Sequence, residues 1–144
     1  MPLPIAMHTY LQLSGQWLDP TGKLLTTGYS GLGYAKNNPD MEVLPGLGPI
    51  PQGIYTIGQP FDSPKHGPFV MHLEPDPGTQ TYGRSGFLLH GDSKWHPGES
   101  STGCIIMPRE YREAIWASGD HQLQVLSGMG NNVEAVNRAV TGED

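Results

Sequence analysis

The 144-residue chain is long enough for one domain around a single hydrophobic core, and we expect no second folding unit. Glycine and proline together occupy 34 positions, 20 and 14 respectively, which favours a turn-rich β architecture because no collagen-like period accompanies them. The net charge of -6 argues against nucleic acid or an anionic membrane surface as a partner, and no apolar run approaches the roughly 20 residues that span a bilayer.

The first 27 residues are expected to form a hairpin that packs on the same domain. Residues 10–18 have the composition of a strand, and residues 19–22 supply Asp, Pro, Thr and Gly for a turn. This turn would bring the chain back through residues 23–27. Residues 1–8 contain neither a basic region nor a long apolar one. The sequence therefore indicates synthesis in the cytoplasm without a secretory signal.

The next segment, residues 28–49, has little periodicity and many glycines, asparagines and prolines, which predicts a long irregular loop. Such loops in compact domains are usually functional, so we expect this one to border the functional site. Three short segments between Pro and Gly residues carry the β-branched, aromatic and aliphatic side chains of buried strands. They are residues 53–57, 69–73 and 87–89, and we expect them at the centre of the sheet.

One principal α-helix is predicted over residues 109–118, because Pro108 stands at its start and Gly119 just past its end. Residues 121–126 alternate into a last strand. Residues 127–144 form a polar C-terminal tail. The sequence thus predicts a mainly β domain with one principal helix.

The only cysteine is Cys104, which excludes an intramolecular disulfide and a multi-thiolate metal site within the chain. It is either an inert buried residue or a reactive thiol. A reactive thiol needs a nearby imidazole and backbone N–H groups aimed at the oxyanion of the tetrahedral intermediate. His90 ends a predicted strand 14 positions earlier, a spacing that lets a loop fold back. Gly103 permits close approach of the chain, so that Cys104 and a neighbouring amide could form the oxyanion hole.

The sequence around these two residues resembles a known family. The motifs GRSGF (83–87), HGD (90–92) and STGCI (101–105) resemble the His…Ser-x-Gly-Cys signature of YkuD-like L,D-transpeptidase domains. The motifs YSGLG (29–33), NP (38–39) and GPIPQGIY (48–55) are similar to the N-terminal half of the branch that includes toxins delivered by type VI secretion. The resemblance covers residues 28–126 and implies that they form an L,D-transpeptidase-like β-sandwich catalytic core.

Carried over residue by residue, the resemblance makes Cys104 the nucleophile, His90 its base and the carbonyl of Gly91 the group that orients the imidazole. It implies supporting or substrate-binding roles for Arg84, Ser85, Asp92, Ser101, Thr102 and Gly103.

Two departures from the family pattern concern the substrate. Many members have a second His directly before the Gly-Cys pair, where this chain has Thr102. The Arg that often follows the cysteine is also missing, since Ile106 and Met107 stand there. Arg84 or Arg109 could take the substrate carboxylate instead.

The resemblance implies a peptidoglycan-modifying cysteine enzyme, with L,D-carboxypeptidase or L,D-transpeptidase activity on stem tetrapeptides. The Cys104 thiolate would expel the terminal D-alanine and leave a thioester, which water or a D-amino acid then attacks. No metal or organic cofactor is implied. For the secreted branch, the resemblance implies an interbacterial toxin delivered to the periplasm of a target cell, a secretion apparatus and a cognate immunity protein.

Two other functions fit the residues less well. A zinc peptidase built on His90, Asp92 and His96 lacks the paired spacing of a His-Glu-x-x-His helix. A catalytically inactive wall-binding module would keep the fold, and the presence of both Cys104 and His90 argues against it.

Some polar residues have simpler interpretations. The other histidines within residues 28–126 are interpreted as structural or surface residues, and they are His66, His72, His96 and His121. His96 is in addition a candidate for substrate contact. Arg84 and Asp92 could pair with each other and join two loops, and Trp95 could be either a lid or a packing residue.

Overall fold

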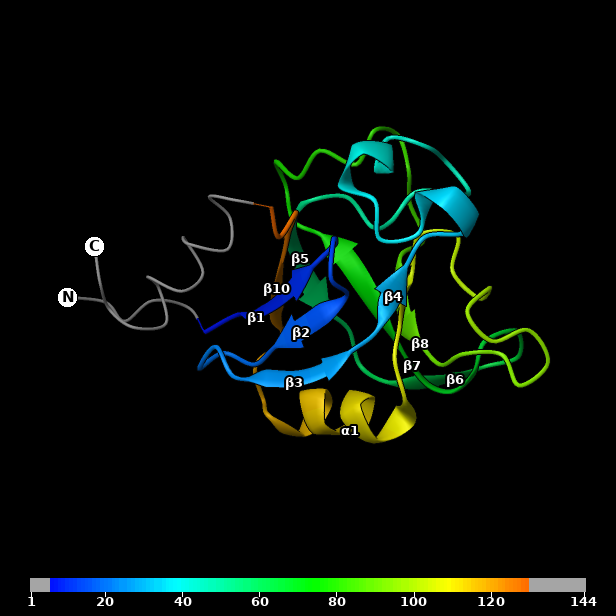
Figure 1. Ribbon diagram of the computed structural model, residues 1–144. Helices are drawn as coiled ribbons and strands as arrows, with labels where there is room; N and C mark the ends of the chain where they lie inside the picture. Colours follow the sequence, from blue (N-terminus) through cyan, green and yellow to red (C-terminus); the bar gives the residue numbers. More distant parts are fainter. Residues whose placement is uncertain (1–5, 130–144) are drawn as a thin grey trace.

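A mainly β fold is found in the computed structural model, which describes residues 6–129 (Figure 1). Its strands are β1 (His8–Leu11), β2 (Gln16–Leu18), β3 (Leu24–Thr27), β4 (Tyr29–Ser30), β5 (Gly53–Ile57), β6 (Phe61–Ser63), β7 (Gly67–Pro75), β8 (Leu88–His90), β9 (Ile105–Ile106) and β10 (Gln122–Leu126). Its helical elements are α1 (Arg109–Ala117) and two 3-10 turns, η1 (Gly33–Ala35) and η2 (Pro39–Met41). The prediction of a mainly β domain with one principal helix after Cys104 is confirmed for this part of the chain.

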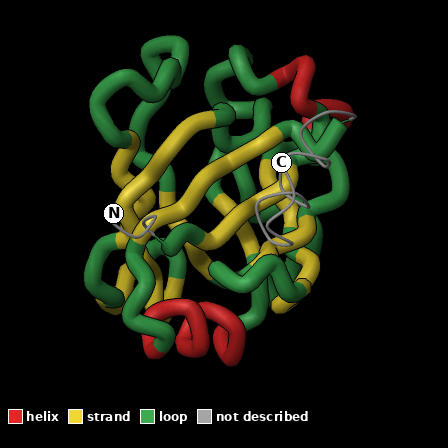
Figure 2. Tube along the Cα trace, turned by 90° about the vertical axis from the view of Figure 1, so that its left-hand side faces the viewer, coloured by secondary structure: helices red, strands yellow, loops and turns green. Residues whose placement is uncertain are grey.

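The strands form one continuous sheet in the order β3-β2-β1-β10-β5-β7-β8-β9-β4, and β6 pairs with β7 outside this path. Two neighbouring pairs are parallel, β1 with β10 and β8 with β9. The long strand β7 joins the two halves, because its C-terminal part pairs with β5 and its middle with β8. The strands curve round a shared interior, with α1 at one end and the 3-10 turns at the other (Figure 2). No helix between residues 6 and 129 is long and apolar enough to cross a membrane.

The hydrophobic core draws on both halves of the sheet. Tyr10, Trp17, Tyr55, Leu89 and Leu123 are all fully buried within it. Each such side chain contributes on the order of 1.5–3 kcal/mol when it leaves water. Leu89 of β8 and Ile105 of β9 both belong to this core, which anchors the two short strands.

The helix α1 covers one end of this core, where it contacts β7 and β8. It begins after Pro108, whose backbone is extended, and it ends before Gly119, whose φ is 78°. Ile115 is fully buried on its inner face, and Tyr111 and Trp116 pack on the core beside it. The predicted start of the helix is therefore confirmed, and its end lies one residue before the predicted one.

The prediction of one strand over residues 10–18 is wrong, because a tight turn divides it into β1 and β2. The Gly15 N–H donates to the Leu11 carbonyl at 2.8 Å, and Gly15 has a φ of 77°, which favours glycine. A Cβ at position 15 would lie 2.1 Å from the Gly28 carbonyl oxygen. The break thus depends on a close approach between chain segments that no local pattern indicates.

The other predicted elements are found close to their expected places. Strand β5 has the predicted bounds, and β7 and β8 contain most of the two segments predicted beside it. The three strands are neighbours in the sheet, as expected. Residues 28–49 hold only β4, η1 and η2 and are otherwise irregular. Most of the predicted tail, residues 130–144, lies outside the described residues, so the division into a hairpin, a core and a tail stays a prediction.

Candidate active site

The parallel pair β8–β9 brings His90 and Cys104 together. The register pairs Leu89 with Ile105 and His90 with Ile106, so Cys104, directly before β9, lies beside Leu88. Side chains alternate along a strand, and residues in register point to the same side of a sheet. Cys104 and His90 therefore share one face, on adjacent strands and two residues apart along them.

His90 presents an unpartnered nitrogen on this face. Its side chain is buried, and Nδ1 lies 2.8 Å from the Gly91 carbonyl oxygen. A carbonyl only accepts, so Nδ1 carries the proton and Nε2 keeps a lone pair. Nε2 is buried and has no hydrogen-bond partner among residues 6–129. Burial lowers the pKa of His90 from 6.5 to about 4, although the hydrogen bond to Gly91 raises it, and the imidazole is neutral at pH 7.

Gly91 itself is confined by a buried cation. A Cβ at position 91 would lie 2.9 Å from Arg112 Nη2. The Arg112 guanidinium is buried and donates to the backbone carbonyls of Met107, Pro68 and Phe69. It therefore has little freedom to move away from a larger residue at position 91.

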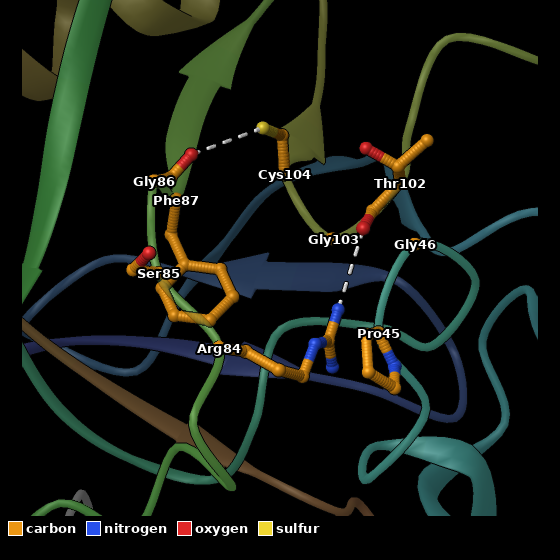
Figure 3. Close-up of a pocket in the computed structure, with 9 residues that line it drawn as sticks. All are labelled: Pro45, Gly46, Arg84, Ser85, Gly86, Phe87, Thr102, Gly103 and Cys104. Atoms are coloured by element: carbon orange, nitrogen blue, oxygen red, sulfur yellow. Dashed lines mark hydrogen bonds between the residues drawn. The ribbon is translucent and has the colours of Figure 1, made fainter.

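The Cys104 thiol is nearly buried, with 8% of the residue exposed. Its Sγ lies 4.0 Å from the Gly86 carbonyl oxygen (Figure 3). Burial raises the pKa of the thiol, while the Leu88 backbone and the charges of Lys65 and Arg84 lower it. Because the imidazole is neutral and the thiol protonated, the resting pair is suited to general-base activation, in which proton transfer accompanies attack.

The turn before Cys104 is held by the buried Ser101 hydroxyl. Ser101 Oγ donates to the Cys104 carbonyl at 2.6 Å and accepts from the N–H groups of Gly31 at 2.9 Å and Gly103 at 3.2 Å. Ser101 thus shapes the nucleophile loop from behind. The Gly103 N–H, one neighbouring amide available for an oxyanion hole, is engaged by this hydroxyl in the free protein.

Arg84 is a clamp for the irregular segment rather than a partner of Asp92. Its Nη1 donates to the carbonyls of Glu42 and Pro49, and its Nη2 donates to those of Gly48 and Thr102. Figure 3 shows the guanidinium reaching beneath Gly103 toward the Thr102 carbonyl. Gly103 has a φ of 140°, and a Cβ there would lie 2.6 Å from Arg84 Nη2. The suggestion that Arg84 and Asp92 pair with each other is therefore wrong.

Asp92 organises the loop between His90 and Cys104. Its carboxylate accepts from Tyr29 Oη at 2.7 Å, Ser100 Oγ at 2.8 Å and the backbone N–H of Gly98 at 2.9 Å. Burial raises the pKa of Asp92, but these hydrogen bonds outweigh it and lower the pKa below its ordinary value. The imidazole Nδ1 is bonded to the Gly91 carbonyl instead, so Asp92 acts on the ring only at a distance.

A cavity of about 200 Å³ opens beside the thiol (Figure 3). Its lining residues are Pro45, Gly46, Arg84, Ser85, Gly86, Phe87, Thr102, Gly103 and Cys104. Pro45 and Gly46 belong to the irregular segment, which therefore borders the cavity as predicted. Ser85 and Thr102 line the wall, whereas Ser101 and Asp92 are outside it.

Another histidine, His66, lies against His90 and was not expected at the site. The two ring centroids are 4.3 Å apart, with 31° between the ring planes. His66 lies in the turn between β6 and β7, 24 positions from His90, so no local sequence signal could reveal the contact. His72 and His121 stack on Phe61 and Trp116, in keeping with the structural roles expected of them.

The zinc-peptidase alternative has no geometric support. Between residues 6 and 129, no three His, Cys, Asp or Glu side chains are grouped so that they could hold a metal ion. His96 is exposed and lies 3.6 Å from Glu99 rather than beside His90.

Comparison with known proteins agrees with the predicted family and fold. The model of the Tlde1 domain, the type VI secretion L,D-transpeptidase effector family, matches residues 25–130. The structure of Bdellovibrio bacteriovorus Bd1075 is similar with a TM-score of 0.55 and 14% identity, over 84% of this chain and 47% of that one. The Ldtfm-avibactam carbamoyl enzyme is similar with a TM-score of 0.51 and 14% identity, over 86% of this chain and 49% of that one.

These likenesses concern the fold, and the chain spans about half the length of the two solved structures. The predicted L,D-transpeptidase-like fold is confirmed by them. Curated proteins give no match.

Proposed function

We propose that this chain, which belongs to the Tlde1 domain family, is a peptidoglycan-modifying cysteine enzyme that acts on the L,D bond of stem peptides. The observation that carries the proposal is the buried Nε2 of His90, which has no partner among residues 6–129 and lies on the same sheet face as Cys104. A buried polar atom without a partner costs on the order of 1–3 kcal/mol, and at His90 it leaves a lone pair free to take the thiol proton during the reaction.

The proposed reaction has two halves. His90 Nε2 takes the proton of Cys104 as Sγ attacks the carbonyl on the L-centre of the third stem residue. Collapse of the tetrahedral intermediate breaks the bond to the terminal D-alanine, whose amine receives the proton from His90 and leaves a thioester on Cys104. Water then releases the shortened stem, or the amine of a D-amino acid or another stem replaces the lost residue.

The Gly91 carbonyl has the orienting role in this proposal. Its bond to Nδ1 selects the tautomer that offers Nε2 to the thiol. Ser85, Thr102 and the Arg84 clamp shape the cavity in which the stem would lie. Ser101 and Asp92 keep the loops on either side of the thiol in place.

The biological setting is also part of the proposal. Membership of the family supports a toxin that is made in the cytoplasm and delivered by a secretion apparatus to the periplasm of a target bacterium. A cognate immunity protein would protect the producer.

Mass spectrometry of a stem tetrapeptide incubated with the chain tests the reaction. We expect loss of the terminal D-alanine, and exchange of that residue when a second D-amino acid is added. The Cys104→Ala variant is the matched control and should leave the tetrapeptide intact. Binding of cell-wall fragments without any turnover would instead favour the inactive wall-binding module.

A further inference from the structure

The substrate of the proposed reaction carries a negative charge close to the bond that breaks. The carboxylate of the terminal D-residue is one residue, roughly 3.5 Å of extended chain, from the attacked carbonyl. An enzyme that selects terminal residues therefore profits from a cation beside its nucleophile. Lys65 and Arg84 are the two cations whose charges oppose the effect of burial on the Cys104 thiol, which raises its pKa.

Arg84 has almost no donors left for a substrate. Its two terminal nitrogens carry four N–H groups, and the four carbonyls of Glu42, Gly48, Pro49 and Thr102 accept one bond each. The planar fork that would bind a carboxylate is thus turned toward the backbone. The expectation that Arg84 takes the substrate carboxylate loses its support.

Arg109 is engaged as well. Its Nε lies 2.7 Å from Glu113 on the exposed face of α1. The third arginine near the site, Arg112, is buried and bonded to three backbone carbonyls. Neither residue offers a free cation to the cavity.

Lys65 is placed differently. It is exposed in the β6–β7 turn, which the pairing of Ser63 with Gly67 closes and the bond from the His66 N–H to Ser63 Oγ supports. Its neighbour His66 lies against the His90 ring, so the turn is held beside the candidate base. Lys65 makes no ion pair within residues 6–129. The turn beside the candidate base therefore carries a flexible, exposed ammonium group with three donors.

We propose that Lys65 binds the free carboxylate of the terminal D-residue and so makes the site selective for chain ends. This inference rests on the proposed function. The turn that carries Lys65 lies against His90 through the ring of His66, and Lys65 is not among the residues that line the Arg84 cavity. In this proposal, a stem whose peptide occupies the cavity extends its last residue toward Lys65.

Alkylation of the single cysteine tests the charge effect without any turnover. Iodoacetate carries a carboxylate and iodoacetamide does not, so the ratio of their rates at Cys104 reports a cation that attracts carboxylates. Lys65→Gln should lower this ratio by about two- to fivefold, the range of an exposed charge pair. Lys65→Arg should keep it. Lys23→Gln, which removes the same charge from the distant β2–β3 turn, should leave it unchanged.

Kinetics on two substrates test the specificity. The wild-type chain should have a lower KM for a tetrapeptide with a free carboxylate than for its C-terminal amide, by about three- to tenfold. Lys65→Gln should remove most of this preference, and Lys65→Arg should retain it. An unchanged alkylation ratio together with an unchanged preference would overturn the proposal. If the wild-type chain releases no D-residue, the proposed function fails, and the alkylation ratio alone decides about Lys65.

Discussion

Two buried histidines, one in each parallel strand pair of the sheet, differ in how many of their ring nitrogens make hydrogen bonds. His8 in β1 has both ring nitrogens engaged, because Nδ1 lies 3.1 Å from Trp17 Nε1 and Nε2 lies 3.1 Å from the Asp120 carbonyl oxygen. Within residues 6–129, His90 in β8 has only Nδ1 engaged. Burial lowers the pKa of both rings, so neither burial nor the direction of the pKa shift separates them. The free Nε2 is what distinguishes a candidate base from a structural histidine.

The largest effects are expected from the pair itself. His90→Ala and Cys104→Ala should each reduce kcat/KM for a stem tetrapeptide by at least about a thousandfold, because each removes half of one nucleophilic unit. The double variant should be hardly worse than either single one. Circular dichroism should show an intact fold, since the only hydrogen bond within residues 6–129 that His90→Ala breaks is the one between Nδ1 and the adjacent Gly91 carbonyl. Near-normal turnover by Cys104→Ala would refute the assignment.

His8→Ala should have the opposite profile. It leaves the buried Trp17 N–H without its acceptor, which costs on the order of 1–3 kcal/mol of unfolding free energy. Turnover of the folded protein should change by less than about threefold, because an interaction far from the transition state adds nothing to catalysis. Urea unfolding checks the expected loss of stability, and kcat/KM measured on the same preparation checks the expected activity. Loss of activity at unchanged stability would contradict the comparison.

Asp92→Asn separates two ways of orienting His90. With the Gly91 carbonyl in that role, the variant should lose only about tenfold in kcat, or roughly 1.4 kcal/mol, through loosening of the loop that Asp92 holds. A triad acid would cost far more. Turnover with folding checked in parallel provides the measurement, and a loss above about a thousandfold would show that the carboxylate, not the carbonyl, supports the imidazole.

The smallest effect is expected from the ring that covers His90. A base works only when unprotonated, so kcat/KM of the wild-type chain should fall on the acid side near the His90 pKa of about 4. His66→Ala exposes the His90 ring and should raise its pKa toward 6.5, moving the acid limb to higher pH while activity at pH 7.5 is kept. His66→Phe should keep the ring covered, so the acid limb of its pH profile should stay at the low pH of the wild-type chain. Coincident pH profiles for all three proteins would exclude a positioning role for His66.

Local signals were enough where neighbouring residues decide the conformation. Gly53 and the apolar run after it predict β5, and Pro108 with Gly119 predicts both ends of α1. The division of residues 10–18 into two strands escaped prediction, because the turn at Gly15 is confined by the Gly28 carbonyl from another part of the chain. Arg84 shows the same limit, since no pattern near residue 84 indicates that four carbonyls from two distant loops converge on it.

The sequence by itself determined the mainly β class, the helix after Cys104 and the choice of Cys104 and His90 as candidates, because these depend on residue types, turn residues and short motifs. Only the tertiary structure decided that Nε2 of His90 is buried without a partner among residues 6–129, that Arg84 is turned toward the backbone and that His66 lies against His90. Those properties arise from hydrogen bonds and contacts between segments tens of residues apart. They are set only when the chain folds, because folding decides which polar groups have a hydrogen-bond partner and which do not.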